Sequence, residues 1–113
     1  MDKLQAPSRE LAKRILTEVG FEHRLEGFSL RERSGPAPVT MYSFEEVVSL
    51  LNDTHPRLDF EQLEGWIRGV IGDTELAERI AVAIKEGNND RERTCSIRDL
   101  MEKRLNQCRM EVP

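Results

Sequence analysis

Apolar residues recur at helical spacing in five blocks of this sequence, and residues that start or stop helices bound each block. The first block, Arg9–Val19, follows Ser8 and precedes Gly20. Serine is a favoured helix N-cap, and glycine is favoured just past a helix C-terminus. The apolar residues of the block lie three and four positions apart, so they share one helix face. The pattern therefore predicts an amphipathic helix over 9–19.

The same signals predict four more helices after residue 42. Ser43 is followed three residues later by Glu46, which is a capping-box pattern at the start of the second helix. Asp59 is positioned to cap the third helix. Gly72 and Asp73 separate the third helix from the fourth so closely that we expect a tight helical corner.

Ser96 is expected to cap the last helix, after a polar loop over 88–90. The large apolar residues of the third and fourth helices should anchor the core, namely Phe60, Trp66, Ile67, Leu76 and Ile80. Gly65 and Gly69 lie four residues apart inside the third helix. Glycine costs a helix about 0.5–1 kcal/mol relative to alanine, so we expect a neighbouring helix, or the tryptophan of a packed layer, to approach closely at these positions.

Residues 27–42 follow a different pattern. Phe28 and Leu30 alternate with polar residues, and Val39–Tyr42 is rich in residues that favour strands. Two prolines and a glycine between positions 34 and 38 indicate a turn. The sequence therefore predicts a mainly α fold, a compact bundle of about five short amphipathic helices with a small two-stranded β-hairpin.

The length of 113 residues suits one helical domain over 1–113, with frayed ends at 1–7 and 110–113. No apolar stretch approaches the length of a membrane span, and the first residues lack the apolar core of a signal peptide. We therefore expect a cytoplasmic protein with no membrane partner.

The charge distribution argues against a nucleic-acid partner. The net charge is −4, and residues 43–90 carry eleven acidic and four basic groups, a local net charge of −7. In the last helix, Arg98 and Arg109 lie on one flank while Lys103 lies on another, so the basic residues form no single stripe. Arg104 falls inside the apolar stripe, where its stem should lie on the core and its head should reach water or a carboxylate.

No cofactor, metal or disulfide is expected. Structural zinc ligands come in pairs two to four residues apart, and His23, His55, Cys95 and Cys108 include no such pair. Two cysteines thirteen residues apart on one helix would lie about 20 Å apart, too far for a disulfide. We expect Cys108 in the core and Cys95 in a loop or cap.

Three segments form a pattern that extends from Tyr42 to about Leu105. They are Ser43-Phe44-Glu45-Glu46-Val47, then Trp66-Ile67, then Gly72-Asp73-Thr74-Glu75-Leu76-Ala77-Glu78-Arg79-Ile80. The pattern resembles a family of small prokaryotic domains of unknown function and covers a little over half of the chain. The resemblance implies a fold, and no activity or functional residue.

The sequence favours a non-enzymatic protein-interaction or regulatory module. The alternative is an enzyme, or a regulatory domain of an enzyme, with a small-molecule site near His55, Asp59 and Trp66. His55 beside Asp59 could serve as a general base, but no nucleophile or oxyanion donor lies nearby in the sequence, so no catalytic residue is assigned. A nucleic-acid binder is the weaker alternative.

The best candidate for a partner surface is the hairpin over 27–42. A lone two-stranded hairpin is marginal in water, so the apolar residues Phe28, Leu30, Val39 and Met41 must pack somewhere. Its edges would expose unpaired backbone groups that invite an added strand from a protein partner or a second copy. The alternative is a protected hairpin without a partner, guarded by the charged residues 31–33.

Overall fold

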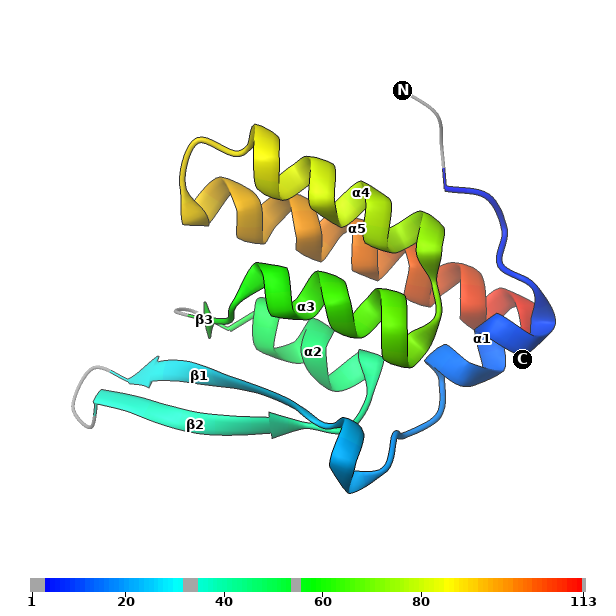
Figure 1. Cartoon of the computed structure of the whole chain (residues 1–113), viewed down its shortest axis with the longest axis horizontal. Coiled ribbons are helices and arrows are strands. Elements are labelled where there is room, and N and C mark those ends of the chain that lie inside the picture. The colour runs from blue at the N-terminus through cyan, green and yellow to red at the C-terminus, as the bar shows by residue number, and fades with distance from the viewer. Residues whose placement is uncertain (1–3, 32–34, 54–55, 113) are drawn as a thin grey trace.

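The structure is a computed structural model that describes residues 4–31, 35–53 and 56–112. Within these ranges, five α-helices stand beside a small three-stranded antiparallel sheet (Figure 1). The helices are α1 (Arg9–Ile15), α2 (Phe44–Leu51), α3 (Phe60–Trp66), α4 (Thr74–Glu86) and α5 (Asp90–Glu111). A 3₁₀ turn, η1 (Phe21–His23), precedes the sheet, and a π-helical turn, η2 (Ile67–Ile71), continues α3. The mainly α fold with a small β element is confirmed.

Helix starts follow the predicted caps in α1, α2 and α3, and Asp73 caps α4. The side chains of Ser8, Ser43, Asp59 and Asp73 each accept a hydrogen bond from a backbone N–H in the first turn of α1, α2, α3 and α4. Such bonds satisfy N–H groups that have no partner within the helix.

The predicted corner between the third and fourth helices is also present. Gly72 adopts a left-handed conformation with φ of +84°, which a residue with a side chain rarely adopts. The carbonyl of Ile67 accepts hydrogen bonds from the N–H groups of Gly72 at 2.9 Å and Asp73 at 3.0 Å. Because Asp73 immediately caps α4, the chain reverses without a connecting loop.

The first helix is shorter than predicted. It ends at Ile15, with Leu16 as its C-cap, instead of continuing to Val19. The N–H of Val19 donates to the carbonyl of Tyr42 at 2.6 Å. A contact with a residue distant in the sequence therefore replaces the last turn of the predicted helix.

The last helix begins seven residues earlier than predicted, with its cap at Asn89 instead of Ser96. The Asn89 side chain accepts from the N–H of Glu92 at 2.9 Å, and Glu92 accepts from the N–H of Asn88 at 3.2 Å. Asn89 therefore caps α5, which begins at Asp90, so the expected cap at Ser96 is wrong. Ser96 lies inside the helix.

The sheet holds the predicted hairpin and one further strand, but residues 35–38, predicted as a turn, belong to the second strand of the hairpin. β1 (Leu25–Arg31) pairs with β2 (Gly35–Met41) on one side and with the short β3 (Pro56–Arg57) on the other, both antiparallel. A Cβ atom built on Gly27 would lie 2.9 Å from the carbonyl oxygen of Arg57 and from a methyl group of Leu50. Glycine at 27 therefore lets β1 lie close to both β3 and α2.

A continuous core gathers side chains from the sheet and from all five helices. α5 packs against α1, α2 and α4, while α3 packs against α4. Trp66, Ile67, Leu76 and Ile80 are buried as predicted, whereas Phe60 is only partly buried.

Two expectations about local packing are wrong. A Cβ atom added at Gly65 or Gly69 would meet nothing within 4 Å, so no helix approaches these glycines. Residues 4–7 are not frayed, because Pro7 is buried and Leu4 packs against the core. The helix α5 likewise continues through Met110 to Glu111. None of the described helices is both long and apolar enough to cross a membrane.

Candidate functional site

An open groove is lined by residues of β3 and of the first half of α5. These two segments lie at the end of the molecule where α3 also begins (Figure 1). Its volume is about 870 Å³, within the range of about 300–1,000 Å³ that is usual for ligand sites. One wall comes from the end of α2 and the segment through β3: Leu51, Asp53, Pro56, Arg57, Leu58 and Phe60. The other wall comes from α5: Asp90, Arg91, Thr94, Cys95 and Arg98.

The α5 wall follows from helical spacing. Arg91, Cys95 and Arg98 occupy positions i, i+4 and i+7, so they lie on one face of the helix. The buried residues of α5 begin only at Ile97. The first turns of α5 therefore extend past the core and present polar side chains to the groove.

Arginines give the groove free positive charge. The guanidinium groups of Arg57 and Arg91 make no hydrogen bond or ion pair with any residue in the described ranges. Arg98 lies 3.9 Å from Asp99, a distance too long for a hydrogen bond. These guanidinium groups stand beside the apolar side chains of Leu58 and Phe60.

The two carboxylates of the groove are already engaged. Asp90 accepts a hydrogen bond from Arg93 at 3.1 Å, and Asp53 accepts one from the hydroxyl of Ser29 in β1. Within the described ranges, neither carboxylate forms an ion pair with Arg57 or Arg91.

The two cysteines differ in exposure. Cys108 is buried in the core as predicted, and burial raises the pKa of its thiol to about 11. Cys95 is exposed and lines the groove. It lies within α5 instead of in the expected loop or cap, because α5 begins at Asp90.

Two of the residues proposed for a small-molecule site, Asp59 and Trp66, make structural contacts. Trp66 is buried, and its indole N–H donates to the carbonyl of His23 at 2.6 Å. Asp59 caps α3 by accepting from the N–H groups of Glu61 and Gln62. Neither residue lines the groove, and His55 lies outside the described residues.

The predicted partner residues lie on two opposite faces of the sheet. Gly27 pairs with Val39 and Phe28 pairs with Pro38 in the β1–β2 register. Side chains alternate along a strand, so Val39 and Met41 share the inner face while Phe28 lies on the outer face. Met41 is fully buried, whereas Phe28 is 49% exposed. The side chain of Leu30 lies outside the described residues.

The free edge of β2 is poor in donors. Pro36 and Pro38 have no N–H to donate to β1. Hydrogen-bonded positions alternate along an antiparallel pair, so the residues of β2 that exchange hydrogen bonds with β1 are the odd-numbered ones. The backbone groups of both prolines therefore point outward, where they offer carbonyls but no N–H. Such an edge resists the addition of a strand.

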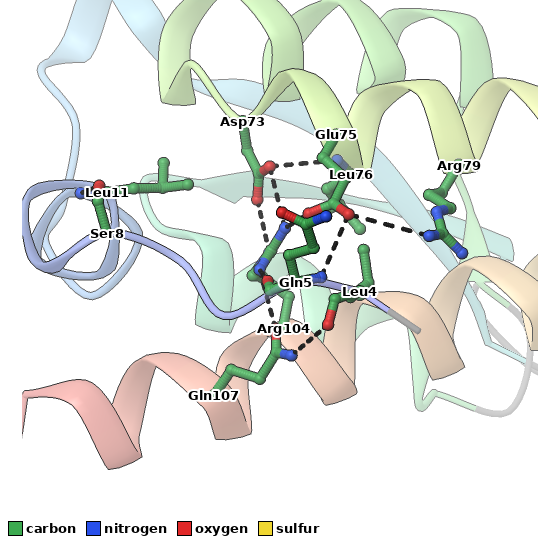
Figure 2. Close-up of polar contacts among 10 residues, drawn as sticks. All are labelled: Leu4, Gln5, Ser8, Leu11, Asp73, Glu75, Leu76, Arg79, Arg104 and Gln107. Atoms are coloured by element: carbon green, nitrogen blue, oxygen red, sulfur yellow. Dashed lines mark hydrogen bonds and ion pairs between the residues drawn. The ribbon is translucent and has the colours of Figure 1, made fainter. Parts of the chain in front are cut away.

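A second cluster surrounds Arg104, which is 1% exposed (Figure 2). Its Nε lies 2.8 Å from Asp73, and one terminal nitrogen lies 2.9 Å from Glu75. The other terminal nitrogen donates to the carbonyl of Gln5 at 2.6 Å and to the side chain of Gln107 at 2.9 Å. The expected reach of Arg104 toward a carboxylate is confirmed, but its head is buried.

Glu75 is held in its charged form by this cluster. Burial by itself would raise the pKa of the Glu75 carboxyl group. Hydrogen bonds from the Gln5 N–H at 3.2 Å and from Arg104 outweigh burial and lower that pKa below its ordinary value.

No family model, curated protein or solved structure matches this chain. The resemblance of residues 42–105 to a family of prokaryotic domains therefore stays a prediction. Within the described ranges, no three histidine, cysteine, aspartate or glutamate side chains form a group that could hold a metal ion.

Sequence reasoning missed the groove because its walls come from segments far apart in the chain. Arg57 and Arg91 stand 34 positions apart, and no local pattern joins them. Arg104 did carry a signal, because a charged residue inside an apolar stripe needs partners. Those partners could not be named before the position of residues 4–7 was known.

Proposed function

We propose that the protein is a non-enzymatic interaction module that binds an acidic, extended segment of a partner protein in the groove between β3 and α5. One observation carries the proposal: Arg57 and Arg91 lack partners among the described residues and stand beside apolar side chains. Arginine pairs with carboxylates through two parallel hydrogen bonds and is enriched at binding hot spots.

The overall charge of the chain supports this choice of partner. The protein carries a net charge of −4, so a basic groove is a local exception that attracts anions to one place. The apolar wall of Leu51, Leu58 and Phe60 would receive aliphatic side chains of the same segment. Among the described groove residues no histidine accompanies the thiol of Cys95, which favours binding over catalysis.

The test uses the ¹⁵N-labelled full chain and a capped peptide of sequence Glu-Leu-Ser-Glu-Leu-Glu. We expect saturable shifts of the backbone amide signals of Arg57, Leu58, Thr94 and Arg98. The double variant Arg57→Glu/Arg91→Glu should bind at least about tenfold more weakly, because it reverses both unpartnered charges.

The matched control is Lys85→Glu/Lys103→Glu, which makes the same charge change at exposed positions outside the groove. If both double variants weakened peptide binding equally, the loss of affinity would come from the net charge of the protein and not from the groove, and the proposal would be overturned. Saturable binding of a single-stranded DNA oligonucleotide in place of the peptide would also overturn it.

A further inference from the structure

Residues 4–7 lie in an extended segment beside the start of α4 and the second half of α5 (Figure 2). We name this segment the strap. Three side chains hold its backbone: Glu75 accepts from the N–H of Gln5 at 3.2 Å, Arg104 donates to the carbonyl of Gln5 at 2.6 Å, and Gln107 donates to the carbonyl of Leu4 at 3.0 Å. We name these three side chains the cradle.

The cradle recognises backbone groups, which every peptide segment carries. Two apolar anchors add side-chain specificity, since Leu4 packs against the core and Pro7 is buried. The two residues between them, Gln5 and Ala6, are exposed. A segment with leucine three positions before proline would therefore make the same contacts, whatever its two middle residues are.

The cradle does not depend on the strap for its shape. Asp73 lies 2.8 Å from Arg104, and both side chains are at most 2% exposed. Glu75 lies 2.9 Å from the same guanidinium group. Arg104 also donates to the side chain of Gln107 at 2.9 Å. None of these contacts involves the strap, so they favour the preorganisation that a binding site requires.

We propose that Glu75, Arg104 and Gln107 form a receptor for an extended Leu-x-x-Pro segment of a partner protein, and that the strap occupies this receptor as an internal competitor. The strap is tethered, so its effective concentration is of millimolar order and it blocks weak ligands. A partner binds when it displaces the strap. This inference is independent of the groove between β3 and α5.

The test weakens the strap in the full chain and leaves the cradle unchanged. Gln5→Pro removes the N–H that Glu75 accepts, and Leu4→Asn removes an apolar anchor if the proline variant does not fold. The probe is a capped peptide, Lys-Leu-Gln-Ala-Pro-Ser. We expect either strap variant to bind the peptide at least about tenfold more tightly than the wild type does, with saturable shifts of the Glu75 and Gln107 signals.

Two controls make the result specific to the cradle. A peptide with N-methylglutamine in place of glutamine lacks the decisive N–H and should bind at least about tenfold more weakly. Gln107→Leu in the strap variant should also weaken binding, whereas Arg109→Gln should not.

The proposal is overturned if a folded strap variant shows no saturable binding, or if the N-methyl peptide binds as well as the parent. A wild-type dimer that the peptide dissociates would place a second copy's segment in the receptor and would also overturn the assignment to a partner.

Discussion

Arg104 occupies a position in α5 that an apolar residue would normally fill. Its guanidinium group is buried with Asp73, and Asp73 also accepts from the N–H of Leu76 to cap α4. An ion pair of this kind contributes little compared with an apolar pair, but it becomes costly when one partner is removed, because the other charge stays buried. The pair therefore makes the contact between α4 and α5 specific.

We expect Arg104→Met to lower the free energy of unfolding by about 3–5 kcal/mol, because it leaves the Asp73 carboxylate buried and unpaired. Urea denaturation followed by circular dichroism measures the change. Arg109→Met is the control on the same helix, since Arg109 is exposed and should change stability by less than about 0.5 kcal/mol. A loss below about 1 kcal/mol for Arg104→Met would contradict the buried ion pair.

Glu75 should make stability depend on pH. Its folded-state pKa lies below the ordinary value of 4.5, so its contribution is complete above pH 4.5 and is lost as the pH falls through the folded-state pKa. We expect wild type to be more stable than Glu75→Gln near neutral pH, with the difference shrinking below pH 4.5. Denaturation curves between about pH 3 and about pH 7 measure it. A difference that stays constant across this range would show that the charge of Glu75 plays no part.

At the scale of elements, two glycines have opposite effects on stability, one in β1 and one in α3. Gly27 lies in β1 where a side chain would collide with the backbone of β3 and with Leu50. Gly65 lies in α3 with open space around the position of a Cβ atom. The same residue type is thus required in one element and unfavourable in another.

We expect Gly27→Ala to destabilise the protein by about 1–3 kcal/mol through overpacking. Gly65→Ala should stabilise it by about 0.5–1 kcal/mol, because alanine loses less backbone entropy in a helix and meets nothing. Thermal and urea unfolding of the two variants form a matched pair. A stabilising Gly27→Ala would mean that β3 does not approach β1 as described.

At the scale of the whole molecule, Trp66 joins the sheet side of the fold to the helices. Its ring is buried at the end of α3, and its N–H reaches the carbonyl of His23 in η1, just before β1. One side chain therefore fills the core and also positions the entry to the sheet.

We expect Trp66→Ala to lower the free energy of unfolding by about 3–5 kcal/mol, because it leaves a cavity in the core. Trp66→Phe keeps most of the apolar volume but loses the hydrogen bond to the His23 carbonyl. It should therefore lower the free energy of unfolding by only about 0.5–1.5 kcal/mol relative to wild type. Chemical denaturation compares the two with wild type. If Trp66→Ala unfolds with nearly wild-type stability, the core has been assigned to the wrong face of α3.

The helices, most of their caps and most of the core were predictable from sequence because they depend on neighbours a few residues away. The Ser43–Glu46 cap, the corner at Gly72 and the burial of Ile67 and Ile80 all follow from local spacing. The start of α5 was mispredicted for a local reason, since Asn89 and Glu92 form a reciprocal cap that competes with Ser96.

Only the tertiary structure decided the features that require segments far apart in the chain. The end of α1 depends on a bond from Val19 to Tyr42, and β3 is too short for any periodic signal. The register between β1 and β2 puts Phe28 and Val39 on opposite faces, because a shift of one residue exchanges the faces of a strand. The groove and the cradle arise in the same way. Arg57 and Arg91 line one groove, and Arg104 contacts the backbone of Gln5, only because the packing of the helices brings these distant segments together.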